Sequence, residues 1–176
     1  MKIYIIRHGQ TKLNAQHLIT GDLDDELTEK GIEQARAAVA LVPATVKHIY
    51  SSSLGRAKQT AGVINEKLNL PITFHGELKE VNFGDLNGTP YLDEIKARHI
   101  AMDFDWRPSG ECFEDVKARI LKILIEIAGE SQDGEALIIA HGGTIRMLHF
   151  LTFGEPMGPI ENASFHTFDL DKILNN

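Results

Sequence analysis

The chain has 176 residues and a mass of 19.5 kDa, a size that suits one domain with a single hydrophobic core. Its net charge of −7 at pH 7 argues against a surface for nucleic acid or an anionic membrane. The single cysteine, Cys112, cannot form an internal disulfide, and no apolar run approaches the ~18 residues of a membrane span. We therefore expect one cytoplasmic domain over residues 1–176, with neither nucleic acid nor membrane as a partner.

The first predicted element is a buried strand within residues 2–10, which read KIYIIRHGQ. An uninterrupted run of apolar residues is typical of a strand covered on both faces in a parallel sheet. Ligands of open α/β sheets bind just beyond the carboxyl ends of the strands, where Arg7 and His8 would lie. Gly9 allows the chain to turn there and its backbone to approach a bound group. This strand end is therefore a candidate functional site.

Helices and strands then alternate along the chain. Arg56 falls in the first turn of a predicted helix, and a cation beside the positive end of a helix dipole suggests that an anion lies nearby. The predicted elements are a polar loop at 10–27 that includes Asn14, a helix capped by Thr28 and ended by Pro43, a strand at 46–51, a helix with its inner face from Ala57 to Leu68, and a strand at 72–74.

Glu80 follows in the segment 77–88, among apolar residues that include Val81 and Phe83. A carboxyl group in such a setting can hold its proton near neutrality, because burial disfavours the charged form. Two helices are predicted next. The first opens at Thr89-Pro90, and the second begins at Phe113 and stops at Gly129.

A second strand at residues 136–140 repeats the first design, because it runs directly into His141 and Gly142. Two buried strands that each end in His-Gly indicate a functional site and not packing alone. A helix at 144–153 and an alternating strand at 164–170, expected at an edge or in antiparallel pairing, complete the chain. The order of elements predicts an α/β fold, a three-layer sandwich with a mostly parallel central sheet.

The residues gathered at one edge of this sheet suit phosphoryl transfer. The guanidinium groups of Arg7 and Arg56 match the oxygens of a tetrahedral dianion. A neutral imidazole, as on His8, is a competent nucleophile toward phosphorus, and the two arginines with His141 can neutralise the charge without a metal ion. Glu80 could protonate the departing alkoxide and then activate the water that hydrolyses the phosphohistidine.

The chain resembles the histidine phosphatase superfamily in its phosphoglycerate-mutase-like branch, which includes α-ribazole phosphatase and broad-specificity phosphatases. The resemblance covers nearly the whole chain. It rests on Arg7-His8-Gly9 with Thr11 and Asn14, on Gly21, Asp24, Leu27-Thr28, Gly31 and Gln34-Ala35, on residues 52–57 and 59–61, on Glu80, Phe83-Gly84, Gly88 and Gly110-Glu111, and on His141-Gly142-Gly143.

This resemblance implies that His8 is the phosphorylated nucleophile and that Glu80 is the proton donor. It implies a phosphate pocket formed by Arg7, Asn14, Arg56, His141 and Gly142. Because the two arginines are paired and no carboxylate cluster suits Mg²⁺ or Zn²⁺, we expect no metal ion or other cofactor. The chain departs from the family in having Leu86-Asn87-Gly88 where Trp-Glu-Gly is common, and Cys112 where Ser is common.

Three functions remain open at this stage: hydrolysis of small phosphorylated metabolites, which we favour, a cofactor-dependent phosphoglycerate mutase, and a non-catalytic phospholigand sensor. A mutase needs a second anion site and a closing lid. Lys96, Arg98 and His99 share a short helix with Asp93 and Glu94. We therefore expect no strong second anion site and substrates whose alcohol part is neutral or weakly polar.

Overall fold

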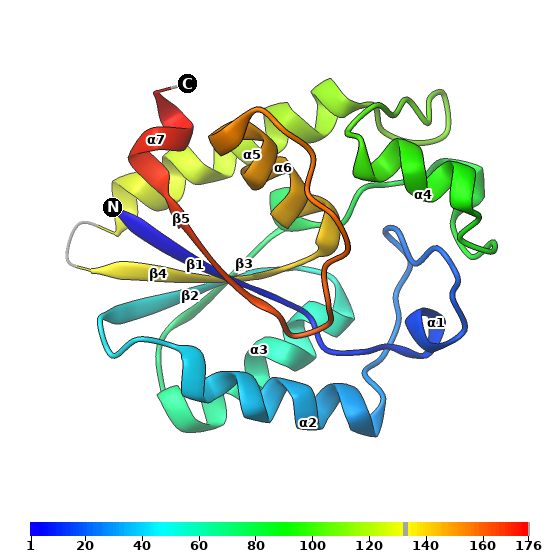
Figure 1. Cartoon of the computed structure of the whole chain (residues 1–176). Coiled ribbons are helices and arrows are strands. Elements are labelled where there is room, and N and C mark those ends of the chain that lie inside the picture. The colour runs from blue at the N-terminus through cyan, green and yellow to red at the C-terminus, as the bar shows by residue number, and fades with distance from the viewer. Residues whose placement is uncertain (132–133, 176) are drawn as a thin grey trace.

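The computed structural model describes residues 1–131 and 134–175, and within them five strands form one sheet in the order β3-β2-β4-β1-β5 (Figure 1). The first four strands along the chain are parallel, and β5 pairs antiparallel with β1 at one edge. The strands are β1 (Lys2–Arg7), β2 (Val46–Ser52), β3 (Ile72–His75), β4 (Glu135–Ala140) and β5 (Phe165–Asp169).

Helices cover both faces of this sheet and give the expected α/β sandwich of three layers (Figure 1). Helices α2 (Glu29–Ala38) and α3 (Gly55–Leu68) pack on one face. On the other face lie α5 (Phe113–Glu130), α6 (Gly142–Phe153) and α7 (Leu170–Leu174). Two further helices, α1 (Lys12–Ala15) and α4 (Asp93–Ile100), lie beyond the carboxyl ends of the strands.

Residues 3–6 of strand β1 are all apolar because both faces of the strand are covered there. Ile3 and Ile5 belong to the core under α5 and α6, whereas Tyr4 and Ile6 belong to the core over α2 and α3. Successive side chains of a strand point to opposite faces, so a strand between two helix layers needs apolar residues at every position. The strand register then sets the position of the residues just past the strand end.

The pairing of β1 with β4 places the two His-Gly segments side by side. Arg7 lies opposite Ala140, and the N–H of His8 donates to the Ala140 carbonyl at 3.0 Å. His8 and His141 therefore leave neighbouring strands at the same edge of the sheet. The sequence repetition that predicted a site at this edge has this simple geometric basis.

Several predicted boundaries are wrong. The polar loop at 10–27 contains the short helix α1, whose N-cap Thr11 accepts from the N–H of Asn14. Helix α4 begins at Asp93 and not at Pro90, because hydrogen bonds to Ile19 and His17 hold residues 88–91 in a non-helical loop. The helix that follows Phe113 continues past Gly129, and the helix α7 was not expected.

Thr28 caps α2 as predicted, by accepting from the N–H of Gly31 at 3.1 Å. Helix α2 itself ends at Ala38, and a 3-10 turn, Val39–Leu41, leads to Pro43. Two other 3-10 turns, Gly76–Leu78 and Gly84–Leu86, flank Glu80.

Within the described part of the chain, no helix is both long and apolar enough to cross a bilayer.

Helix α5 offers a direct test of the core. Ile123 is completely buried, whereas Ile125 on the opposite side of the same helix is 62% exposed. We expect Ile123→Ala to lower the free energy of unfolding by about 2 to 5 kcal/mol, because it leaves a cavity between helix and sheet. Ile125→Ala is the matched control and should change it by less than about 0.5 kcal/mol. Urea unfolding curves give both values, and equal losses would contradict the assigned burial.

Candidate active site

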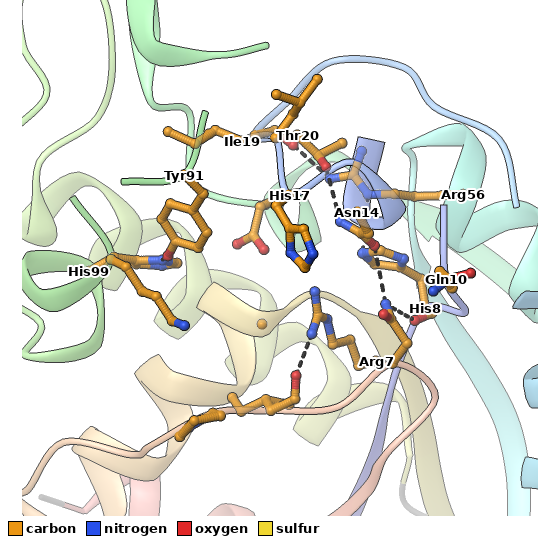
Figure 2. Close-up of a pocket in the computed structure, with 18 of the residues that line it drawn as sticks. Arg7, His8, Gln10, Asn14, His17, Ile19, Thr20, Arg56, Tyr91 and His99 are labelled. Atoms are coloured by element: carbon orange, nitrogen blue, oxygen red, sulfur yellow. Dashed lines mark hydrogen bonds between the residues drawn. The ribbon is translucent and has the colours of Figure 1, made fainter. Parts of the chain in front are cut away.

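A cavity of about 400 Å³ opens beyond the carboxyl ends of β1 and β4 (Figure 2). It is lined by residues from the end of β1, from helices α1, α3, α4 and α6, and from the loops that hold residues 17–21, 80–91 and 159–162. The predicted residues that line it are Arg7, His8, Asn14, Arg56, Glu80 and Gly142. Most of the residues that the sequence predicted for the site therefore line one cavity, although they come from distant segments of the chain.

His8 is buried at the inner end of the cavity, with only 2% of its surface exposed. Its Nδ1 lies 2.8 Å from the carbonyl oxygen of Gly9, a contact in which the ring must donate. The Nε2 atom therefore carries the lone pair, and Arg56 Nε donates to it at 3.2 Å. Burial, together with the charges of Arg56 and Arg7, holds the pKa of His8 well below its ordinary value. His8 is neutral at physiological pH, with the lone pair of its Nε2 beside an arginine.

Arg56 is completely buried in the first turn of α3. Its two terminal nitrogens donate to the carbonyl oxygens of Gly21 and Leu23, at 2.6 and 2.8 Å. Burial lowers the pKa of Arg56 to about 10, so the side chain stays charged at neutral pH. Asp24 lies at the start of the same helix, where its carboxylate accepts from the N–H of Gly55 at 3.0 Å and so caps the helix.

Arg7 and Asn14 complete the wall on this side of the cavity. Arg7 Nη1 donates to the carbonyl of Ile160, and its Nε has no partner among the residues that the structure describes (Figure 2). Asn14 donates to Thr20 Oγ1 at 3.2 Å and accepts from Asn162 at 3.2 Å. Both side chains are thus fixed by the protein while donor groups remain for a ligand.

Glu80 reaches the cavity from the loop between the two 3-10 turns. Its Oε1 accepts from the backbone N–H of Gly143 at 3.0 Å and from that of Val81 at 2.9 Å. A Cβ on Gly143 would stand 2.2 Å from Oε1, so only glycine allows this contact. Val81 and Phe83 are buried beside it as predicted, but the carboxylate itself is half-buried and bound by backbone donors.

Arg119 on α5 holds the loop that carries Glu80. It forms a two-pronged ion pair with Glu111, with contacts of 2.7 and 2.9 Å. It also donates to the backbone carbonyls of Glu77, Lys79 and Glu80. The same Glu111 carboxylate accepts from the N–H of Asn82 at 2.9 Å. The position of Glu80 is therefore fixed from behind by an ion pair outside the cavity.

His141 lies behind His8, with the two ring centres 5.1 Å apart, and does not line the cavity itself. Its Nε2 contacts Ser52 Oγ at 2.8 Å, and its Nδ1 has no hydrogen-bond partner among the described residues. Burial, with the charge of Arg56 next, lowers the pKa of His141 well below its ordinary value. Like His8, it is a neutral imidazole in the resting site.

Tyr91, Arg146 and Asn162 are among the lining residues that the sequence did not predict. Arg146 carried a usable signal, because it is a lone charge in the otherwise apolar helix that follows His141. Of the three cations expected to form a solvated helix face, Lys96 and His99 line the cavity. Arg98 does not, and its guanidinium instead stacks on Trp106 at 4.9 Å.

Asn87 and Cys112, where the chain departs from the family pattern, both form hydrogen bonds that stabilise the local backbone or loops. Asn87 donates to Asp22 and Asn82, at 2.8 and 3.0 Å, and so joins two loops that border the site. The N–H of Cys112 donates to the carboxylate of Asp115 at 3.0 Å, so a backbone group at the start of α5 has a partner.

In the described part of the chain, no three His, Cys, Asp or Glu side chains gather in a way that could hold a metal ion.

The buried histidines predict a pH dependence of stability. Burial lowers the pKa of His8 and His141 well below the ordinary value and that of His99 to about 3, so the three rings stay neutral in the fold as the pH drops. The unfolded chain binds protons at them below about pH 6.5, so the free energy of unfolding should fall from pH 7.5 to 5.5. Urea unfolding measures the loss, and ring nitrogen NMR shifts should stay constant over this range. Titration of these rings with midpoints near 6.5 in the folded protein would contradict the assignment.

Comparison with known proteins agrees with this geometry. The family model described as histidine phosphatase superfamily (branch 1) matches residues 3–173. Phosphoglycerate mutase-like protein 4 of Arabidopsis thaliana is 32% identical, over 99% of this chain and 76% of its own length. The probable phosphoglycerate mutase GpmB of Escherichia coli is 30% identical, over 89% of this chain and 76% of its own.

A solved structure, that of a mycobacterial glucosyl-3-phosphoglycerate phosphatase, superposes with a TM-score of 0.82 at 28% sequence identity. The superposition covers 94% of this chain and 91% of that one. The resemblance drawn from the motifs and the fold expected from them are both confirmed. The chain belongs to branch 1 of the histidine phosphatase superfamily.

Proposed function

We propose that the protein hydrolyses phosphate monoesters of small metabolites through a phosphohistidine on His8. The observation that carries the proposal is the buried, neutral His8, whose Nε2 lone pair lies beside Arg56 in a cavity that Glu80 also lines. A neutral imidazole is a competent nucleophile toward phosphorus. Arg7 and Arg56 would bind the equatorial oxygens of the phosphoryl group, with Asn14 and the N-terminus of α6 at Gly142 beside them.

In the first step His8 Nε2 attacks phosphorus, and the bond between phosphorus and the ester oxygen breaks. The electron pair of that bond goes to the leaving oxygen, which takes a proton from Glu80. His141 would donate a hydrogen bond to the phosphoryl group, because its Nδ1 is the buried ring atom that lacks a protein partner. The arginines neutralise the charge that spreads over the phosphoryl oxygens.

In the second step a water molecule attacks the phosphohistidine and gives its proton to Glu80. The bond between phosphorus and Nε2 breaks, its electron pair returns to His8, and inorganic phosphate leaves. Glu80 is then protonated again and ready to act as the acid. The reaction as proposed draws its charge stabilisation from arginine and imidazole groups and calls on no metal ion.

The named relatives divide between mutases and a phosphatase, so the chemistry of this site must decide between the two activities. Hydrolysis is favoured because the segment from Gly88 to Pro108 contains only the short helix α4, with turns and irregular backbone on both sides of it. Such a segment offers little material for a lid that would keep water from the phosphohistidine. We propose α-ribazole phosphate and other small monophosphates as candidate substrates. We also propose that the protein is located in the cytoplasm.

Replacement of His8 by Ala should abolish turnover of phosphate monoesters, because no other ring nitrogen in the cavity has the same contact with Arg56. Brief incubation of the wild type with ³²P-labelled substrate should yield an acid-labile, base-stable label on His8. Phosphate release by the wild type should be unchanged in EDTA.

Three outcomes would overturn this assignment. The first is wild-type turnover by the His8→Ala variant, and the second is loss of activity in EDTA. The third is interconversion of 2- and 3-phosphoglycerate that matches or exceeds phosphate release and is stimulated by 2,3-bisphosphoglycerate, which would identify a mutase.

Glu80→Gln tests the proton donor. The variant keeps an oxygen acceptor for the Gly143 N–H but has no acidic proton to give. Its kcat should fall by about 10²- to 10⁴-fold on alkyl phosphates and far less on p-nitrophenyl phosphate, whose leaving group hardly needs a proton. The exposed Glu155→Gln is a charge-matched control. Equal losses on both substrates would assign Glu80 to binding or structure instead.

A further inference from the structure

The segment that returns from α6 to β5 holds the strand end that carries His8. The carbonyl of Ser164 accepts from the N–H of Arg7 at 3.1 Å, and the N–H of Ala163 donates to the carbonyl of His8 at 3.2 Å. Asn162 adds a side-chain contact, because its Nδ2 donates to the same His8 carbonyl at 3.2 Å. Asn162 also lines the cavity, and the proposed chemistry gives it no role.

The backbone directly after Asn162 has an unusual conformation. Ala163 has a φ of 55°, in the left-handed region that residues with a Cβ rarely adopt. In this conformation the backbone N–H of Ala163 and the side-chain amide of Asn162 both reach the carbonyl of His8. Costly backbone conformations of this kind cluster at functional sites, where the surrounding contacts compensate for them. The convergence of two donors on His8 therefore points to a function of this turn.

The carbonyl of His8 decides the orientation of the Asn162 amide. A carbonyl oxygen can only accept, so the atom of Asn162 that faces it is the nitrogen. The same NH₂ group donates to Oδ1 of Asn14 at 3.2 Å. Asn14 must then direct its own NH₂ group away from Asn162. This group donates one hydrogen to Thr20 Oγ1 at 3.2 Å (Figure 2), and the other is left for a ligand in the cavity that Asn14 lines.

Thr20 alone could not set the orientation of Asn14. A hydroxyl group both donates and accepts, so either end of the Asn14 amide could face it. A reversed amide would present its oxygen to the phosphoryl group and would repel it. Asn162 excludes this reversed orientation, because two NH₂ groups would then face each other. The donor of Asn14 is thus fixed by a chain of contacts that begins at the backbone of His8.

We propose that Asn162 is a positioning residue for phosphoryl transfer, which fixes the amide of Asn14 so that one of its N–H groups faces the phosphoryl group beside His8. The inference rests on the proposed function, in which Asn14 lies next to that group. The contacts through Asn162 also tie this donor to the residue that carries the attacking ring. The donor and the ring therefore keep the same relative position, and small misplacements of such groups are costly in rate.

A double-mutant cycle tests whether Asn162 acts through Asn14. Asn14→Ala should lower kcat/KM for p-nitrophenyl phosphate by about 10- to 100-fold, the loss expected for one hydrogen bond to a charged group, and Asn162→Ala should lower it by at least about fivefold. The double variant should lie within about twofold of Asn14→Ala, because Asn162 then has no amide to fix. The N–H of Ala163 still binds the His8 carbonyl in each variant. Asn175→Ala, which removes an exposed amide near the end of the chain, is the matched control.

Losses that multiply in the double variant would overturn the proposal, because Asn162 would then act on the phosphoryl group or on the fold independently of Asn14. An unchanged kcat/KM in Asn162→Ala would overturn it as well.

A second measurement uses only the wild type and does not depend on the variants folding. Inorganic phosphate is added until the NMR shifts of the His8 ring nitrogens are saturated. One side-chain amide proton of Asn14 should then move downfield, and by far more than either amide proton of Asn162. Constant Asn14 signals, or larger shifts at Asn162, would contradict the assigned orientation. This titration needs no turnover, so failure of the proposed hydrolysis is distinguishable, since it would show as no His8-dependent release of phosphate.

Discussion

The parallel pairing of β1 with β4 is the constraint on which the site depends. Because Arg7 lies opposite Ala140, the two strands end at the same level of the sheet. The ring centres of His8 and His141 are therefore 5.1 Å apart. Both strands are apolar on both faces, so a slip of register would disturb both helix layers at once. The hydrophobic core thus fixes the spacing of two polar side chains that take no part in it.

The second feature of the site is buried positive charge without matching carboxylates. Among the described residues, Arg7, Arg56 and Arg146 form no ion pair, and each instead donates to backbone carbonyl oxygens. Carbonyl dipoles hold a guanidinium in place without cancelling its charge. Burial also keeps His8 and His141 neutral beside these cations. An anionic ligand would therefore meet a fixed positive field and two neutral imidazoles beside it.

The ion pair that supports the site, between Arg119 and Glu111, lies outside the cavity. Arg119 and Glu111 hold the backbone of residues 77–82, and Asp24 binds the start of α3 while Gly21 and Leu23 in the same loop hold Arg56. These contacts leave the charges in the cavity free for a ligand and restrict the motion of the loops that carry them. Rigid support of this kind matters because misplacement by about 1 Å can cost on the order of a hundredfold in rate.

The sequence by itself determined the α/β class, the buried strands and the candidate site residues at their ends, because strand periodicity and terminal motifs are local properties. It also placed Glu80, since a resemblance in motif order covers that loop. Only the tertiary structure decided that Tyr91, Arg146 and Asn162 share the cavity, and that Arg119 supports Glu80 from another layer. Local pattern assigned Lys96, Arg98 and His99 to one solvated face, whereas packing buried His99 and left the other two exposed. Which side chains meet across a cavity depends on long-range packing, and no short stretch of sequence contains that information.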